Sequence, residues 1–337
     1  MVDFILILPL LVSFLVTFFS LGIWILKARS IGLEWEDMNK LHRRKVAGSG
    51  GIMVLLGFLL GALLYVAYKT FFLQADNLSE ILALLLVVVF ASGIGFIDDL
   101  LGWRSGGLSR KSRLTILLFD SVPLIAINAG RSDISIPLFG NTNLGLLYAL
   151  VAIPIGIMGA TSTYNFLAGY NGLEAGQGIL ILSSLGIVAF FTNHTWLSVI
   201  AFCMVAALIA FLLFNFFPAQ VFPGDALTYA VGSLIAGIAI LGNFEKVALF
   251  FFIPYILETV LKSRGKLVKY SFGKPQKDGT LNEPYDKIYG LEHLAIRILK
   301  KINVPSTEKN VVFLLWSFQV FIIVLGFILF RDGIFNA

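Results

Sequence analysis

The chain has 337 residues, of which 58% are hydrophobic and only 13% charged, with a formal net charge of +5 at pH 7. Soluble domains are about 45–50% apolar and about 25% charged, so this composition excludes an ordinary soluble protein and indicates a polytopic membrane protein. The single cysteine, Cys203, excludes a disulfide framework and a cysteine-based metal site.

Ten apolar stretches approach the length of about 20 residues that a transmembrane helix needs. In chain order they cover residues 4–26, 47–68, 80–97, 113–129, 144–160, 176–192, 195–214, 225–242, 244–262 and 311–330. No basic region precedes the first stretch, so we expect a retained span and not a cleaved signal peptide. We therefore predict an all-α protein with one transmembrane domain over residues 1–337.

Lysine and arginine are distributed unevenly between the loops. If the N-terminus lies outside, the inside loops and the span-edge residues Arg113 and Lys262 hold 21 of the 25 basic residues. The positive-inside rule predicts this asymmetry, which supports ten spans and an outside N-terminus. The polar segments gather on the same face, including a long loop at about 263–310. We therefore expect one active site, facing the cytosol.

Two adjacent carboxylates, Asp98 and Asp99, end the third apolar stretch in the segment GFIDDLLGWRSGGLSRKSR, residues 95–113. Ionised side chains at the edge of a span are costly unless they meet water, a counter-ion or a metal. If the helix continues through them, the two acids point about 100° apart and can serve two roles. A helix end whose acids pair with the following arginines explains the pattern about as well.

Two further segments combine glycine with amide or carboxylate side chains. In TSTYNFLAGYNGLEAGQG, residues 161–178, the density of hydrogen-bonding groups favours a ligand-binding loop over a plain connector. In FNFFPAQVFPGDALTY, residues 214–229, Asp225 opens a span and is either a helix cap or a ligand for a hard metal ion. Phe222, just before it, is suited to lipid packing or to stacking.

Two basic segments complete the inside face. EDMNKLHRRKVAGSGG, residues 36–51, can anchor a span against anionic lipid, which explains its basic residues but not Asp37, Asn39 or its glycines. KSRGKLVKYSFGKPQKDGT, residues 262–280, either reflects the positive-inside bias or binds polyphosphate through its lysines. Beyond them, apolar residues recur at helical spacing between Tyr285 and Lys301 with basic partners. This pattern favours an amphipathic helix on the membrane surface.

Taken in order, these segments resemble the polyprenyl-phosphate N-acetylhexosamine-1-phosphate transferases, and most closely the UDP-GlcNAc:dolichyl-phosphate GlcNAc-1-phosphotransferase branch. The resemblance runs from DMNK through GFIDD, NFLAGYNGLEAGQG and VFPGD to the last inside loop. It implies transfer of GlcNAc-1-phosphate from UDP-GlcNAc to a polyprenyl or dolichyl phosphate in the bilayer. UMP is released, and polyprenyl-diphospho-GlcNAc is formed as the first lipid-linked step of N-glycan-type assembly. The implied cofactor is Mg²⁺, with Mn²⁺ as the alternative ion.

The resemblance also implies roles for individual residues by motif match. Asp98 and Asp99 would lie near the lipid phosphate, followed by the basic Lys111. Asn165 and Asp225 would contact the metal ion, while Asn171 would bind uridine and Phe222 would stack on uracil. The remaining implied substrate-binding residues are Glu36, Asp37, Asn39 and Lys40 at the nucleotide end, and Lys269, Ser271 and Lys274 in the last inside loop.

The last inside loop departs from the family pattern in two ways. It lacks the histidine run of the muramoyl-pentapeptide branch, which argues against a muramoyl substrate, and it lacks the Arg-His-Arg cluster of the animal and fungal dolichyl branch. A transferase for another UDP-N-acetylhexosamine or for UDP-MurNAc-pentapeptide stays open as an alternative. We expect no nucleic-acid partner, leave a homodimer open, and favour an archaeal cell membrane, or the endoplasmic reticulum if the source is eukaryotic.

Two other classes of protein compete with the transferase. Acids beside spans can be ion sites, so a membrane transporter is the main alternative. Against it, the acids of these motifs stand at the ends of spans. A scaffold is disfavoured by the gathering of Asn, Gly and Asp on one face.

Overall fold

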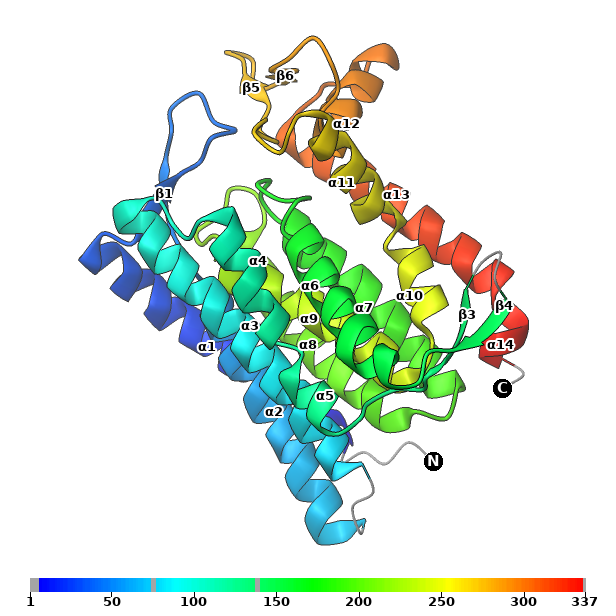
Figure 1. Ribbon diagram of the computed structural model, residues 1–337. Coiled ribbons are helices and arrows are strands. Elements are labelled where there is room, and N and C mark those ends of the chain that lie inside the picture. The colour runs from blue at the N-terminus through cyan, green and yellow to red at the C-terminus, as the bar shows by residue number, and fades with distance from the viewer. Residues whose placement is uncertain (1–5, 74–76, 137–139, 336–337) are drawn as a thin grey trace.

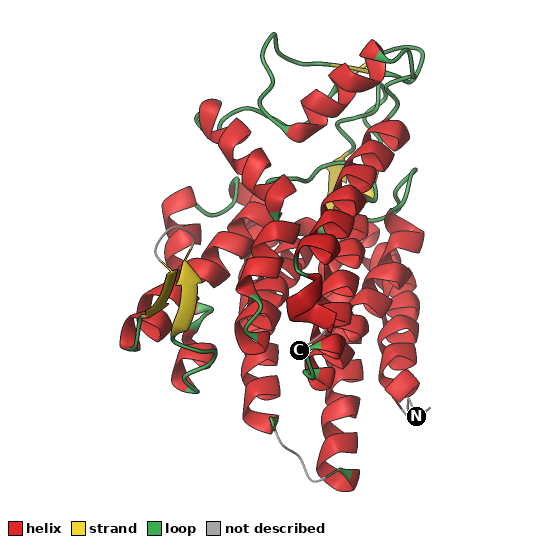
Figure 2. Cartoon of the chain, turned by 90° about the vertical axis from the view of Figure 1, so that its right-hand side faces the viewer, coloured by secondary structure: helices red, strands yellow, loops and turns green. Residues whose placement is uncertain are grey.

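The computed structural model describes residues 6–73, 77–136 and 140–335. Its helices form a bundle, with long loops and two of the three small hairpins gathered at one end (Figures 1 and 2). Within the described residues, seven helices are long and apolar enough to cross a membrane. They are α1 (Ile7–Ile31), α2 (Gly51–Phe72), α3 (Leu78–Ser105), α7 (Leu173–Phe191), α8 (Thr195–Asn215), α9 (Gly224–Gly242) and α13 (Glu308–Leu329).

The other three expected spans are built from shorter helices. They are α4 (Arg110–Phe119) with α5 (Val122–Ala126), the π-helical turn η2 (Tyr148–Ala152) with α6 (Ile153–Tyr164), and α10 (Glu245–Phe251) with α11 (Ile253–Arg264). Proline lies in the first turn of α5, α6 and α11. Proline has no N–H to donate and clashes with the preceding turn, so a new helix starts there. The prediction of a helical, polytopic membrane protein is confirmed, whereas ten spans and an outside N-terminus stay predictions.

Three two-stranded antiparallel sheets interrupt the loops of the described chain. They pair β1 (Glu34–Glu36) with β2 (Lys45–Ala47), β3 (Asp133–Ile136) with β4 (Gly140–Asn143), and β5 (Lys274–Pro275) with β6 (Leu281–Asn282). Register pairs include Trp35 with Val46 and Pro275 with Leu281. In Figure 1 the first and third hairpins lie at the upper end of the bundle, away from β3–β4. The two basic segments that contain these hairpins are therefore folded and lie at the same end.

The expected amphipathic helix is α12 (Leu291–Lys301), and a short α14 (Arg331–Phe335) follows α13. The apolar side chains Leu291, Ile296 and Leu299 are buried. Because α12 contacts α11 and α13, this apolar face packs against protein. The expectation of a helix lying on the membrane surface was therefore correct for its amphipathic pattern and wrong for the partner of its apolar face.

Helix α9 runs through the core of the bundle. Among the seven apolar helices it is the most buried, at 83% of its apolar window, whereas α1 at the edge is only 22% buried. Gly95 lets α3 approach α9 closely, because a Cβ there would lie 2.4 Å from the carbonyl oxygen of Asp225. Small residues permit such close backbone contact between membrane helices. This contact brings the acidic end of α3 against the start of α9.

Candidate active site

Helix α3 continues through Asp98 and Asp99, and the two buried side chains meet different partners. Asp98 Oδ1 accepts a hydrogen bond of 2.7 Å from the backbone N–H of Leu108, and its Oδ2 lies 2.6 Å from Arg113 Nη2. Asp99 instead accepts bonds of 2.7 Å and 3.4 Å from the backbone N–H groups of Asp225 and Ala226. The divergent geometry expected for adjacent helical acids is therefore present.

Asp99 caps the positive end of α9, where backbone N–H groups have no helical partner. The turn before α9 is shaped around this carboxylate: Gly224 has φ +68°, and a Cβ there would lie 2.1 Å from Asp99 Oδ2. Glycine adopts this backbone conformation without the steric cost that other residues incur. The PGD sequence thus brings the Asp225 backbone onto Asp99 and leaves the Asp225 side chain directed elsewhere.

The Asp225 carboxylate faces Asn165 at the end of α6. Asn165 Nδ2 donates a hydrogen bond of 3.0 Å to Asp225 Oδ1, and Arg113 Nη2 lies 3.8 Å from Asp225 Oδ2. The Asp225 side chain is 23% exposed, against 2% for Asp98, so a ligand can reach Asp225 more easily. The structure thus brings together four side chains from α3, α4, α6 and α9.

The loop from Asn165 to Gly172 is braced from both sides. Glu174 Oε1 accepts a 2.8 Å hydrogen bond from the backbone N–H of Gly169, and Asn39 Nδ2 donates a 2.8 Å bond to the Gly169 carbonyl. Asn39 Oδ1 also accepts a 3.2 Å bond from the backbone N–H of Gly273. Asn39 therefore ties the glycine-rich loop to the last loop.

A second polar cluster lies at the other end of the same loop. Asn171 donates from its side chain to Asp37 Oδ2 at 3.1 Å and from its backbone to Glu308 Oε1 at 2.8 Å. Lys40 Nζ contacts Glu308 and lies 3.4 Å from Asp37 Oδ2. Asp37, Asn39, Lys40 and Asn171, expected at the nucleotide end, are therefore close together. Glu36 lies apart from them, exposed and 3.1 Å from Arg43.

The late-loop residues are divided between buried and exposed positions. Ser271 is buried, and its Oγ accepts a 2.7 Å hydrogen bond from Lys262 Nζ, which also contacts the Phe166 carbonyl. Lys269 and Lys274 are exposed, and Lys269 Nζ lies 4.7 Å from the ring centroid of Tyr285. Of the three, only Ser271 is connected to the glycine-rich loop by this contact.

The buried acids Glu258 and Glu292 lie where α11 meets the start of α12. Glu258 Oε2 accepts a 2.6 Å hydrogen bond from the backbone N–H of Leu291 at the start of α12, and its Oε1 lies 3.5 Å from Lys262 Nζ. Burial, followed by the charge of Glu258, raises the pKa of Glu292 well above its ordinary value, although Lys262 opposes the shift.

Phe222 is half-buried in the turn before α9. Its backbone N–H donates to the Ala47 carbonyl at 2.7 Å, and its own carbonyl accepts from Gly50 N–H at 2.9 Å. These bonds attach the turn to the segment that leads into α2. The structure therefore fixes the Phe222 backbone beside the start of α9.

Sequence reasoning selected Lys111 as the basic partner of the acids, but Lys111 is exposed on α4 and lies outside the cluster. Arg113, two residues later, contacts both Asp98 and Asp225. Glu308 and Lys262 were also missed as site residues. Each stands at the end of an apolar stretch, where a charged residue is a usable signal even though its partner is distant in sequence.

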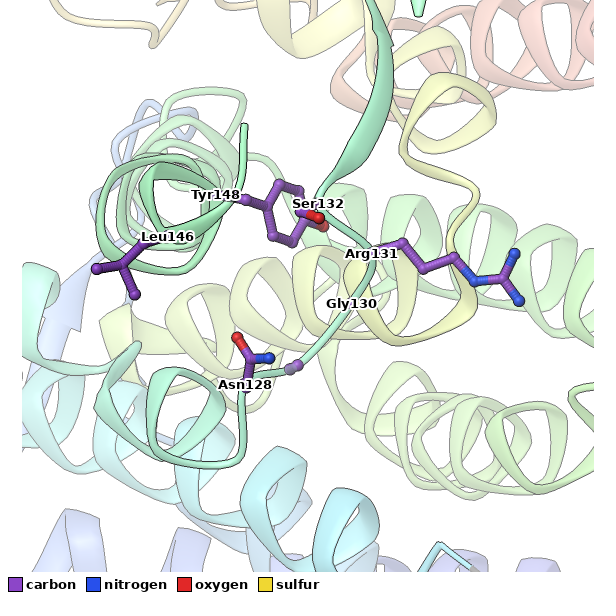
Figure 3. Close-up of a pocket in the computed structure, with 8 residues that line it drawn as sticks. Asn128, Gly130, Arg131, Ser132, Leu146 and Tyr148 are labelled. Atoms are coloured by element: carbon purple, nitrogen blue, oxygen red, sulfur yellow. The ribbon is translucent and has the colours of Figure 1, made fainter. Parts of the chain in front are cut away.

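The structure also contains a cavity of about 440 Å³ between the end of α5 and η2. Tyr148 is one of its lining residues, and in Figure 3 the Arg131 side chain points away from Asn128 and Leu146. Tyr148 donates a 2.6 Å hydrogen bond to Glu245, so its hydroxyl is already paired. None of the predicted site residues lines this cavity, which is therefore separate from the polar cluster.

Comparison with known proteins shows which family this chain is similar to. The model of the glycosyl transferase family 4 matches residues 81–243, which include Asp98, Asp99, Asn165 and Asp225. A protein of Sulfolobus acidocaldarius, provisionally named a UDP-N-acetylglucosamine–dolichyl-phosphate N-acetylglucosaminephosphotransferase, is 31% identical over 95% of this chain and 94% of its own length. The chain belongs to the glycosyl transferase family 4.

Two other relatives define the range of this family. The UDP-N-acetylglucosamine–dolichyl-phosphate N-acetylglucosaminephosphotransferase of Dictyostelium discoideum is 29% identical over 71% of this chain and 69% of its own. A phospho-N-acetylmuramoyl-pentapeptide-transferase of Halalkalibacterium halodurans is 30% identical over 80% of this chain and 87% of its own. The predicted family is confirmed, and the chain is a glycosyl-1-phosphate transferase. The transporter and scaffold alternatives are thereby set aside.

Proposed function

We propose that this enzyme transfers GlcNAc-1-phosphate from UDP-GlcNAc to a polyprenyl phosphate of the dolichyl type. UMP leaves, and polyprenyl-diphospho-GlcNAc is the product. The observation that carries the proposal is the meeting of Asp98, Arg113, Asn165 and Asp225 at the ends of apolar helices. The names of the relatives that match nearly the whole chain support these substrates.

We expect Mg²⁺, or alternatively Mn²⁺, to bind at Asn165 and Asp225. Both side chains offer oxygen donors, and they lie in hydrogen-bond contact from two different helices. Within the described residues, no group of three or more His, Cys, Asp or Glu could hold a metal ion. This sparse donor set fits Mg²⁺, which commonly binds one or two protein oxygens and completes its shell with water and substrate phosphates. The bound ion would neutralise the diphosphate and polarise the phosphorus under attack.

The reaction joins a lipid phosphate oxygen to the β-phosphorus of UDP-GlcNAc and breaks the bond from that phosphorus to the UMP oxygen. Arg113 would stabilise the charge on the phosphates, because its guanidinium lies between Asp98 and Asp225. Asp98 already binds Arg113 and the Leu108 N–H, which favours orientation of Arg113 over proton removal. Asp99 would act as a positioning residue by fixing the start of α9.

The nucleotide end would be formed by Asp37, Asn39, Lys40 and Asn171, with uridine held near Asn171 and uracil stacked on Phe222. The contacts of Asn39 with Gly169 and Gly273 support this assignment, because they close the glycine-rich loop against the last loop. Lys269 and Lys274 are exposed, so their ammonium groups can contact the incoming diphosphate as point charges. Glu36 and Lys111 stay predictions at the edge of the site.

The distribution of basic residues favours ten spans, an outside N-terminus and a cytosolic site. Relatives from two archaea support an archaeal cell membrane as the location. The polyprenyl tail would stay in the bilayer beside the spans, since the acceptor cannot leave it. Homodimerisation stays a prediction.

The experiment is a substrate panel with detergent-purified enzyme. UDP-GlcNAc, UDP-GalNAc and UDP-MurNAc-pentapeptide are each incubated with dolichyl and undecaprenyl phosphates, and the lipid products are identified by mass spectrometry. We expect polyprenyl-diphospho-GlcNAc and an equal amount of UMP. A product only from another UDP-sugar would favour the alternative transferase, and no lipid product from any donor would contradict the proposal.

A further inference from the structure

The segment from Arg264 to Tyr270, which follows α11, exposes apolar side chains next to cations. Leu267 is 41% exposed, Val268 59% and Tyr270 70%. The cations Arg264 and Lys266 precede these residues, Lys269 lies between Val268 and Tyr270, and all three cations are exposed. Three large apolar side chains exposed within four positions form an apolar patch, and such patches mark sites of contact with a protein, a ligand or a membrane.

The backbone of this segment is held in place. Lys266 and Leu267 both lie in the left-handed region, with φ values of +56° and +57°. Residues with a Cβ enter this region at an energetic cost, so surrounding contacts must hold them there. Leu267 N–H donates to the Lys262 carbonyl at 2.9 Å, and Arg110 Nη2 donates to the Leu267 carbonyl at 2.8 Å. The exposure of the apolar residues is therefore a property of an ordered turn attached to α4.

The position of the turn indicates what covers it. On α11, Leu257 is 41% exposed and Val260 62% exposed, so an apolar surface leads along this helix to the turn. On α4, Leu114 is 43% exposed, and that helix begins at Arg110, which holds the turn. In a membrane protein such surfaces face lipid, and the turn lies at their polar end.

We propose that residues 264–270 dock on the membrane interface beside α11. Leu267, Val268 and Tyr270 enter the boundary between headgroups and acyl chains, while Arg264 and Lys266 contact anionic phospholipid headgroups. Apolar residues combined with cations at the end of a lipid-facing helix have the chemistry of an interfacial anchor. The partner is the bulk anionic phospholipid of the bilayer.

Lys262, which lies just before the turn, connects this anchor to the polar cluster. Lys262 Nζ contacts the Phe166 carbonyl and Ser271 Oγ, and Phe166 follows Asn165 directly. Docking of the turn would therefore fix the last loop relative to the glycine-rich loop. The proposal itself concerns lipid contact and does not depend on which sugar is transferred.

The test is a nitroxide label on a Val268→Cys variant of the full chain in lipid nanodiscs. Cys203 is fully buried, and wild type treated in parallel reports any background labelling. Leu257→Cys on α11 is the lipid-facing control, and Asp278→Cys in the exposed turn between β5 and β6 is the aqueous control. Electron paramagnetic resonance compares the accessibility of each label to oxygen and to a water-soluble nickel chelate.

We expect the label at Val268 to resemble that at Leu257, with high oxygen and low nickel accessibility, and to lie deeper in phosphatidylglycerol than in phosphatidylcholine nanodiscs. When Arg264→Glu and Lys266→Glu are added, the oxygen and nickel accessibilities of the Val268 label should shift toward those of the Asp278→Cys label, because each surface cation strengthens membrane contact about fivefold. The melting temperature of each variant checks that it is folded. Accessibilities like those of the label at Asp278→Cys in both lipids would overturn the proposal. A low nickel accessibility at Val268 that appears only when polyprenyl phosphate is added would overturn it as well.

Discussion

The cap that Asp99 places on α9 yields a quantitative prediction for Asp99→Asn. The wild-type carboxylate accepts backbone bonds of 2.7 Å and 3.4 Å and is only 8% exposed. A hydrogen bond to a charged group contributes about 1.5–3 kcal/mol. The interaction of a carboxylate with a helix N-terminus contributes up to about 2 kcal/mol. Asparagine keeps one acceptor but turns an N–H donor toward the second backbone N–H, which loses its bond, so we expect a loss of about 2–3 kcal/mol in the free energy of unfolding.

A loss of this size should lower the melting temperature by about 5 °C, at roughly 2 °C for each kcal/mol in a long chain. Transfer should fall about 100-fold, because Asp225 moves with the start of α9 and small misplacements of reacting groups are costly. Differential scanning fluorimetry and the transfer assay are run beside Asp286→Asn, a matched change at an exposed acid. If Asp99→Asn melts like this control, the capping argument is wrong.

Three other outcomes follow from the site and the late loop. Arg113→Met should reduce transfer by about 100-fold or more, since it removes the cation between two acids, whereas Lys111→Met should reduce transfer less. The reverse order would contradict the assignment of Arg113 as the basic residue of the site. Excess EDTA should abolish transfer and added Mg²⁺ restore it, and full activity in EDTA would exclude the proposed ion. Burial opposes the shift, but hydrogen bonds from Lys300 and Arg297 lower the pKa of Glu283 to about 2. The stabilisation by Glu283 is therefore present above about pH 4.5 and is lost as the pH falls toward 2. Hydrogen exchange in α12 should differ between wild type and Glu283→Gln at pH 7, and the two rates should converge in acid. A difference that persists in acid would refute this role of Glu283.

The membrane fold could be predicted to a large extent from apolar length. Seven expected spans correspond to long helices, because about 20 apolar residues leave few other structures possible in a bilayer. The breaks within the other three were visible in principle at Pro123, Pro154 and Pro254, yet a proline can also kink a continuous helix. The short hairpins carry too few residues to give a sequence pattern.

The site could be predicted only where one segment contains the whole signal. Adjacent acids on a helix diverge by geometry, so two directions for Asp98 and Asp99 could be expected. Their actual partners depend on tertiary packing: the close approach of α3 to α9 at Gly95 decides that Asp99 meets the Asp225 backbone. The choice of Arg113 over Lys111 depends on the phase of α4, which begins only at Arg110.

The most direct test of the account concerns the Asn165–Asp225 pair. Mg²⁺-dependent formation of polyprenyl-diphospho-GlcNAc is measured in wild type, Asn165→Ala and Asp225→Asn, with the melting temperature of each variant as a check on folding. The account predicts that both variants stay folded, lose transfer and no longer respond to Mg²⁺. Wild-type transfer by folded Asp225→Asn enzyme would contradict it.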